Sequence, residues 1–161
     1  MNIEQMQIAE LINDPINARI HSSKNIDAIV ASLEKFGQQK PIVIDKNNKV
    51  IAGNGTLQAA SFLKWKKIDV VVTELEGNEQ LAYSIADNRT AELAVWDKDQ
   101  LAETLAVLQN DNSIEESTTG FLQDEIEKVL SVDLGEQENK EIDTDSFEFA
   151  HTCPKCGFQY D

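Results

Sequence analysis

The chain has 161 residues, of which 41% are hydrophobic and 27% are charged, and its formal net charge is −15. This length is typical of one domain with a small appendage, and the sequence has no run of 18 apolar residues that could form a transmembrane helix. The first residues have neither the basic nor the apolar part of a secretory signal, and the chain has two cysteines. We therefore expect a protein of the reducing cytoplasm, without a disulfide framework.

The negative charge is concentrated in the second part of the chain. Residues 1–100 have 14 acidic and 11 basic side chains, a balance of −3, whereas residues 101–161 have 15 acidic and 3 basic ones, a balance of −12. Nonspecific DNA binding requires clustered Lys and Arg, which the second part lacks. The asymmetry predicts an N-terminal working domain followed by an acidic C-terminal region.

Hydrophobic periodicity and turn residues predict the elements of the first half. Apolar side chains recur at helical spacing up to Gly37, and two β-branched runs flank a polar turn at 46–49. In chain order we expect a strand over 6–12, a helix over 26–36, a hairpin over 41–45 and 50–52, a helix over 57–64 and a strand over 68–72.

The second half is predicted to be helical and then polar. Helices are expected over 78–93, around 101–108 and around 122–129. The predicted organisation is a domain over 1–97, a helical extension over 98–132, an acidic linker over 133–146 and a tail over 147–161. This order predicts the α+β class, with a small mixed sheet and helices followed by a helical C-terminal region.

A glycine-rich turn joins the hairpin to the next helix in the sequence VIAGNGTLQAA, residues 50–60. Glycines let a backbone approach a ligand, and the unpaired N–H groups of a first helical turn favour an anion such as phosphate. Thr56 can add a hydroxyl, and Asn54 can cap the helix or reach the ligand. The alternative is a tight strand-to-helix turn capped by Asn54, because the spacing is neither that of a P-loop nor that of GxGxxG.

Four segments in this order resemble the N-terminal domain of the ParB partition proteins, which share a fold with sulfiredoxin. The resemblance extends over residues 6–97, and residues 85–97 look most like compact ParB-like proteins of phages and mobile elements. The segments are Pro15–His21 around Arg19, Phe36–Val43, Gly53–Ala60 and Ala86–Arg89.

The resemblance implies a site for CTP, or for ATP as in other relatives, with Mg²⁺; some relatives are described as nucleases. It places the phosphates at Gly53, Asn54, Gly55 and Thr56, further nucleotide contacts at Arg19 and Asn88, Mg²⁺ at Asp87, and catalysis at Asp87 and Arg89. Thr56 stands where the family has an arginine, which weakens the case for catalysis more than that for binding. A helix-turn-helix DNA reader is not apparent after residue 100.

Structural explanations exist for the same residues. Arg19 could tie a loop to a helix, Asp87 and Asn88 could face solvent, and Arg89 could pair with Glu92 or Asp87. We expect Trp65 and Trp96 to be packing residues, with base stacking on an exposed aromatic ring as the alternative. His21 lies in a polar loop, and we assign it no role there.

The tail contains Cys153-Pro154-Lys155-Cys156-Gly157, the spacing of half a zinc knuckle. His151 offers a third ligand, and the remaining ligands could come from a second chain in a homodimer, from His21 or from a carboxylate. A redox pair and two free thiols are the alternatives.

Two functional hypotheses follow. The first is a nucleotide-binding protein in the DNA transactions of a phage or mobile element, acting on DNA directly or through a partner. Hydrolysis of the nucleotide and cleavage of DNA are its two candidate reactions. The second is a non-catalytic acidic interaction protein or DNA mimic on the same scaffold. Because no cysteine precedes Cys153, sulfinic acid reduction is not supported.

Overall fold

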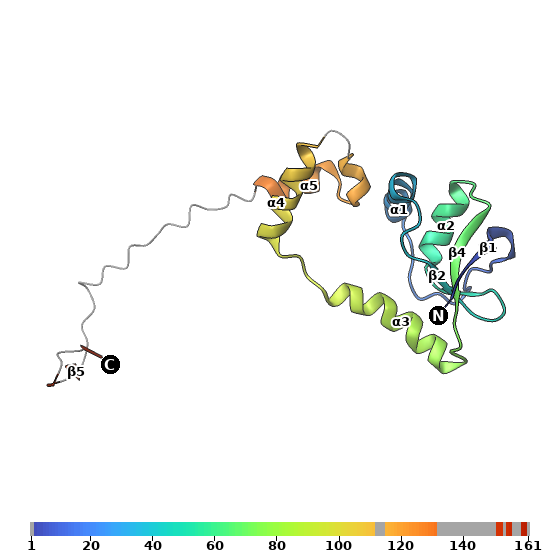
Figure 1. Ribbon diagram of the computed structural model, residues 1–161, viewed down its shortest axis with the longest axis horizontal. Helices are drawn as coiled ribbons and strands as arrows, with labels where there is room; N and C mark the ends of the chain where they lie inside the picture. Colours follow the sequence, from blue (N-terminus) through green and yellow to red (C-terminus); the bar gives the residue numbers. More distant parts are fainter. Residues whose placement is uncertain (1, 112–114, 132–150, 153, 156–158, 161) are drawn as a thin grey trace. The chain divides into compact units, whose positions relative to one another are not determined.

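Four short segments of the first half of the chain pair into one mixed sheet. In this computed structural model the strands are β1 (Ile3–Gln7), β2 (Ile42–Ile44), β3 (Val50–Ala52) and β4 (Lys67–Val72), in the spatial order β1-β4-β2-β3 (Figure 1). β4 pairs antiparallel with β1 and parallel with β2, and β2 and β3 form the expected hairpin. The α+β class with a small mixed sheet is confirmed.

The structure describes residues 2–111 and 115–131, together with 151–152, 154–155 and 159–160 of the tail. The chain divides into two compact units, Met1–Ser131 and Val132–Asp161. Within the described residues, none of the helices has both the length and the apolar character needed to cross a bilayer.

The first strand is shorter and begins earlier than the sequence predicts. It ends at Gln7, and a 3-10 turn, η1 (Ile8–Glu10), follows. Gln7 lies opposite Lys67, the first residue of β4, so no strand remains for the chain to pair with beyond that point. Ile8 and Leu11 still pack against the core from outside the ladder, which explains why their apolar pattern resembled that of a strand.

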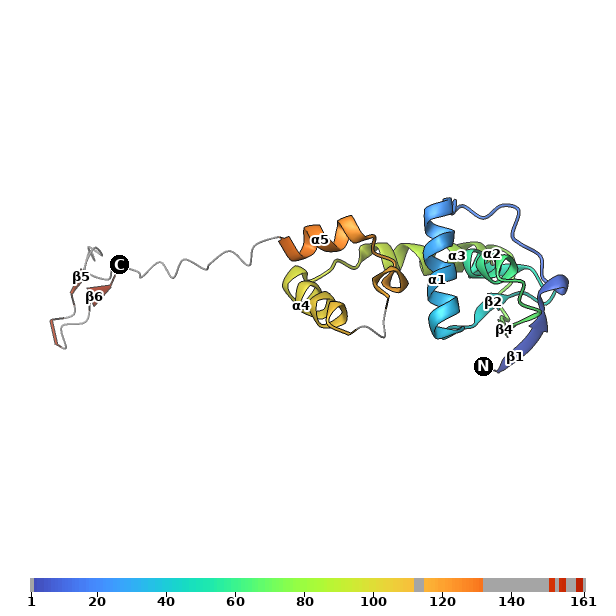
Figure 2. The ribbon, with the colours of Figure 1, turned by 90° about the horizontal axis from the view of Figure 1, so that it is seen from above.

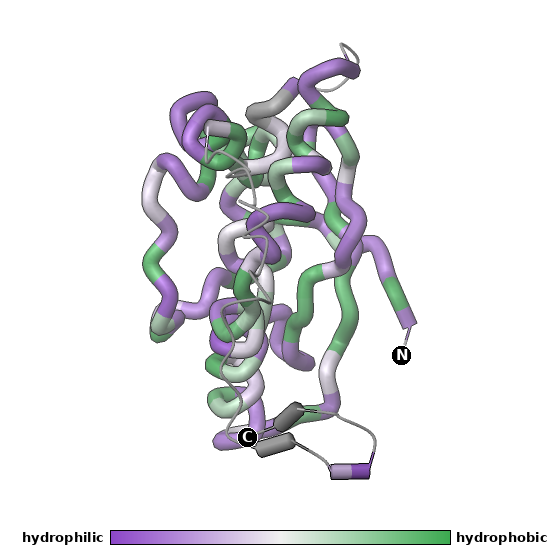
Figure 3. Tube along the Cα trace, turned by 90° about the vertical axis from the view of Figure 1, so that its left-hand side faces the viewer, coloured by the Kyte–Doolittle hydropathy of each residue, from purple (hydrophilic) through white to green (hydrophobic). Residues whose placement is uncertain are grey.

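Two helices cover one face of the sheet and complete the core. They are α1 (Ser23–Phe36) and α2 (Asn54–Phe62), which pack against each other. α1 begins at the cap Ser22, whose side chain accepts a hydrogen bond from the Asn25 N–H, and it ends at Gly37 with a φ of 68°. The hydropathy-coloured trace shows hydrophobic stretches that alternate with hydrophilic ones along the chain (Figure 3). The buried core residues are Leu33, Ile42, Ile44, Val50, Leu57, Ala59, Ala60, Ile68 and Val70.

Helix α3 (Asn78–Leu93) has the predicted bounds but buries little. All of its residues are described and none of them is buried. Leu81 and Ile85 are exposed, whereas Tyr83 and Asp87, on another face, are partly buried. α3 contacts β3 and runs from the sheet toward the next helix (Figure 2). Its position therefore depends on a few polar contacts rather than on a buried apolar stripe.

The extension forms a small helical layer of its own. Leu105 and Ile126 are buried, and the rings of Trp96 and Phe121 pack with their centroids 5.9 Å apart. The expected packing role is confirmed for Trp65, which packs against the core of the sheet domain, whereas Trp96 is 69% exposed in spite of its contact with Phe121. The elements are α4 (Lys98–Gln109), η2 (Glu116–Thr119) and α5 (Gln123–Ser131), of which η2 contacts α1.

Gln38 completes the sheet with its side chain. Its Oε1 accepts a hydrogen bond from the Asp69 N–H at 2.7 Å, and its Nε2 donates to the Asp69 carbonyl at 2.8 Å. Gln38→Ala should lower the free energy of unfolding by about 1–3 kcal/mol, because it leaves two part-buried backbone groups without their partner. Urea denaturation measures this loss. The exposed Gln5→Ala is the matched control, expected within about 0.5 kcal/mol of the parent, and an equal loss in both variants would contradict the assignment.

The pKa of Tyr83 is sensitive to the carboxylate of Asp87, which lies one turn further along α3. Burial, and secondarily the negative charge of Asp87, raise the pKa of the Tyr83 phenol above its ordinary value of 10.0. The folded state then holds this proton more tightly than the unfolded chain, so this contribution to stability is present below pH 10 and is lost as the pH rises through the folded pKa.

Asp87→Asn should lower the pKa of Tyr83 while leaving it above 10, because burial persists. Phenolate absorbance in a Tyr160→Phe background measures it, since the chain has two tyrosines. Asp99→Asn on α4 should change nothing, and an unshifted pKa in Asp87→Asn would show that the two side chains do not face each other.

Candidate functional site

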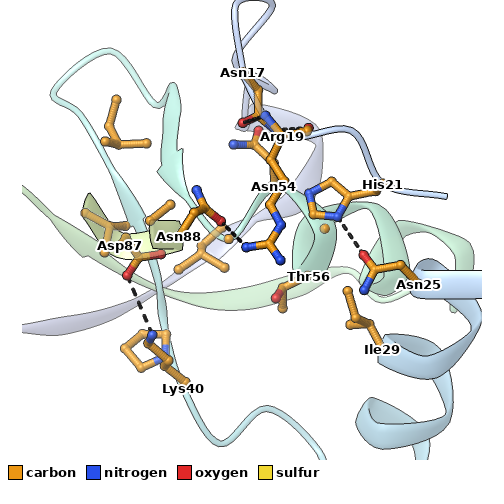
Figure 4. Close-up of a pocket in the computed structure, with 17 residues that line it drawn as sticks. Asn17, Arg19, His21, Asn25, Ile29, Lys40, Asn54, Thr56, Asp87 and Asn88 are labelled. Carbon is orange, nitrogen blue, oxygen red and sulfur yellow. Dashed lines mark hydrogen bonds and ion pairs between the residues drawn. The ribbon is translucent and has the colours of Figure 1, made fainter. Parts of the chain in front are cut away.

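A pocket of about 270 Å³ lies where β3 ends and α2 begins (Figure 4). Its walls come from four separate parts of the chain. These are the polar loop before α1 with the start of that helix, residues 40–43, residues 51–56, and Asp87 and Asn88 of α3. Seven of the eight residues expected in the nucleotide site line it, and Arg89 is the exception.

Gly53 makes the turn between β3 and α2 possible. Its φ of 98° and ψ of 24° lie in the left-handed region. A Cβ built on it would lie 2.6 Å from the Cγ2 of Ile42, closer than real Cβ contacts allow. Glycine is required here both by backbone conformation and by space, so the turn brings the start of α2 directly against β2.

The N-terminus of α2 is open toward the pocket. Gly53 occupies the cap position and has no side chain to accept a hydrogen bond from the first turn. In contrast, Ser22 caps α1 and Asp97 caps α4. The N–H groups at the start of α2, together with the positive end of the helix dipole, can therefore bind an anion.

The side chain of Asn54 is used elsewhere. Asn54 is buried, and its Oδ1 accepts a hydrogen bond from the Asp14 N–H at 3.1 Å. Of the two roles left open for Asn54, capping of α2 is wrong, because Gly53 is the cap residue and Asn54 is already the first helical residue. Its side chain holds the turn around Pro15 in place, which positions the loop that follows.

Arg19 bridges this loop to α3 across the pocket. Its Nη1 donates a hydrogen bond to the Oδ1 of Asn88 at 2.8 Å and lies 3.9 Å from the Oε1 of Glu92. The Nδ2 of Asn88 in turn donates to the Ser84 carbonyl, which fixes the amide orientation. The guanidinium is thus held at the pocket although 69 residues separate it from Asn88.

Asp87 provides the one carboxylate among the described residues that line the pocket. Its Oδ1 lies 3.8 Å from the Nζ of Lys40. The described residues contain no cluster of three or more side chains suited to a metal. This donor set fits a Mg²⁺ ion that takes most of its oxygens from bound phosphate and water, and does not fit a site built from protein ligands alone.

Arg89 points away from this arrangement. Its Nη1 lies 3.3 Å from the Oε2 of Glu92, and its side chain is 62% exposed. Successive residues of a helix point about 100° apart, so Arg89 cannot share the direction of Asn88. The pairing with Glu92 is one of the structural alternatives that the sequence left open.

His21 is a pocket residue to which the sequence analysis assigned no role in this site. Its Nδ1 lies 2.7 Å from the Oδ1 of Asn25, and its ring lies against Gly55. The sequence feature that could have indicated this position is that His21 lies two residues after Arg19 in the same polar segment.

The expected zinc ligands Cys153 and Cys156 lie outside the described residues. His151 begins β5 (His151–Thr152), which pairs antiparallel with β6 (Gln159–Tyr160). The zinc site stays a prediction.

Three comparisons place this fold among known proteins. A profile of the ParB N-terminal domain matches residues 1–89. The ParB-like nuclease domain-containing protein YnaK of Escherichia coli (strain K12) is 38% identical over 64 residues, which make up 40% of this chain and 74% of that relative.

Among solved structures, the C-terminally truncated chromosome-partitioning protein ParB from Caulobacter crescentus, complexed with CTP-gamma-S, matches with a TM-score of 0.69 and 18% identity. The match covers 81% of this chain and 77% of that one. Sulfiredoxin from Arabidopsis thaliana matches with a TM-score of 0.44 and 15% identity, over 53% of this chain and 98% of that one.

The profile spans more than half of the chain, and it includes the glycine-rich turn, Arg19 and the Asp87–Asn88 pair that form the pocket. This protein therefore belongs to the ParB N-terminal domain family.

Proposed function

We propose that the pocket binds a nucleoside triphosphate, CTP in the first place and ATP as the alternative, together with Mg²⁺. One observation carries the proposal: a single pocket gathers the uncapped start of α2, the Arg19 guanidinium and the Asp87–Asn88 pair. The Caulobacter ParB that shares the fold was solved with CTP-gamma-S, which supports the choice of nucleotide.

The chemistry of the walls suits a triphosphate. The first-turn amides of α2 and the Thr56 hydroxyl would bind phosphate oxygens, and Arg19 would add a charge-assisted contact. Asp87 would face the Mg²⁺ that the phosphates carry, and this ion would neutralise part of their charge. Lys40, which already pairs with Asp87, adds a second positive charge at that wall.

The proposal is primarily one of binding. Thr56 cannot make the bidentate contact of an arginine, and the structure does not bring Arg89 to the pocket. Nucleotide hydrolysis or DNA cleavage, the activity in the name of the YnaK relative, would need charge stabilisation from other groups.

We further propose that the protein acts in DNA transactions of a phage or mobile element. Residues 98–131 contain 8 acidic and 2 basic side chains, so this extension cannot bind DNA through counterion release. Contact with DNA would come from the first domain or through a partner protein. The acidic surface itself favours a basic partner.

Titration calorimetry with CTP and ATP, with and without Mg²⁺, tests nucleotide binding. Arg19→Ala should weaken the binding of the preferred nucleotide by about ten- to a hundredfold, the range for a lost hydrogen bond to a charged group. Arg89→Ala is the matched control and should bind like the parent, because its exposed side chain pairs with Glu92. Absence of binding for both nucleotides, or equal losses in the two variants, would reject the site.

The Asp87→Asn variant tests the contribution of Mg²⁺ to nucleotide binding separately from that of the nucleotide itself. Without Mg²⁺ this variant should bind the triphosphate at least as tightly as the parent, because a negative charge that repels the phosphates has been removed. The gain in affinity that Mg²⁺ gives the parent should be lost in the variant. The same calorimetric series measures both effects, and an unchanged Mg²⁺ gain in Asp87→Asn would place the ion elsewhere.

A further inference from the structure

His21 is held in the pocket from two sides. Its Nδ1 lies 2.7 Å from the Oδ1 of Asn25, an amide oxygen that can only accept, so this ring nitrogen carries a hydrogen and donates. Asn25 is itself fixed in the first turn of α1, because its backbone N–H donates to the Ser22 side chain. The ring orientation is therefore set by α1, before any ligand arrives.

The other side of the ring rests on α2. A Cβ at Gly55 would lie 2.8 Å from the Cε1 of His21 and 3.0 Å from the Cδ1 of Ile29. Gly55 lies within α2 and is not among the glycines with positive φ, so its backbone does not require glycine. The space taken by the imidazole and by Ile29 is the reason for a glycine at this position.

This seating leaves one ring nitrogen for the pocket. With Nδ1 engaged by Asn25, the Nε2 edge faces the side of the pocket that holds Arg19 (Figure 4). We propose that His21 contacts the phosphate chain of the bound nucleotide through Nε2. We also propose that residue 55 is a glycine because the absence of a Cβ leaves room for this ring. The inference rests on the proposed function, since it assigns a further residue to that same site.

The contact requires a proton. A phosphate oxygen accepts hydrogen bonds, so Nε2 must donate, and because Nδ1 already donates, the ring must be an imidazolium when the anion is bound. The groups around it are Arg19 from its own loop, the neutral Asn25 and Ile29 from α1, and the positive N-terminus of α2, with Lys40 and Asp87 among the other lining residues. The bound anion would offset the positive charges of these groups.

His21→Asn isolates the nitrogen that faces the ligand, because asparagine can keep the donor toward Asn25 and lacks Nε2. It should weaken CTP or ATP binding by about ten- to a hundredfold at pH 6, with an unchanged thermal midpoint. The ratio of parent to variant affinity should be smaller at pH 8. The nucleotide's own phosphate also titrates in this range, but it does so equally with both proteins, so the ratio isolates His21. Equal affinities, or a ratio that does not depend on pH, would overturn the contact.

A double-mutant cycle of Gly55→Ala and His21→Ala tests the seating without any ligand. With His21 present, Gly55→Ala should lower the thermal midpoint, because the new methyl group displaces the ring. In the His21→Ala background the same change should cost less, since space has been opened and alanine is the better helix former. Equal costs in the two backgrounds would overturn the role assigned to Gly55. If the parent binds neither nucleotide, the proposed function fails, and this thermal cycle still decides whether Gly55 seats the ring.

Discussion

The close approach of Gly53 to Ile42 is the constraint on which the site depends. Because residue 53 has no Cβ and adopts a left-handed conformation, β3 passes into α2 without a connecting loop. The first turn of α2 is consequently buried beside β2, with its backbone amides at the floor of a pocket rather than on the surface. A longer connection would have moved the helix dipole away from the groups that converge on it.

Polar contacts place the other walls. α3 has no buried residue along its whole described length, so the bridge from Arg19 to Asn88 and the pair formed by Lys40 and Asp87 carry much of its attachment near the pocket. These groups are also the ones that an anion and its metal would engage. If the pocket binds a nucleotide as proposed, binding would exchange contacts that hold α3 for contacts with the ligand and would couple the position of this helix to occupancy of the pocket.

Charge separates the two parts of the chain. The domain that contains the pocket is close to balanced, and the helical extension after it is acidic. Two of the positive side chains of the domain, Arg19 and Lys40, line the pocket and would offer an anionic ligand a favourable local contact within a protein that is negative overall. The extension packs its own small core around Leu105 and Ile126, and its 8 acidic and 2 basic side chains lack the clustered positive charge that counterion release from DNA requires.

The sequence by itself determined the local elements, because they follow from short-range periodicity and turn chemistry. The helix expected over 78–93 has these bounds, and the hairpin and the α1 stop at Gly37 are where the turn residues predict them. The segments around Arg19, Gly53 and Asp87 could be singled out because each resembles a family segment in the right order, and the structure shows that all three line one pocket. Their separation in the chain concealed how they meet.

Only the tertiary structure decided those features that depend on contacts between residues distant in the sequence, such as where a strand ends and which partner a side chain has. β1 ends at Gln7 because β4 begins at Lys67, a limit that no local pattern of residues 6–12 contains. Asn54, for which the sequence allowed a capping role, is instead a buried anchor for Asp14, and the position of His21 is set by its contacts with Gly55 and Asn25. Side-chain direction and space at a contact are properties of the assembled fold, so composition and spacing could name the residues of the pocket without showing which atoms face its interior.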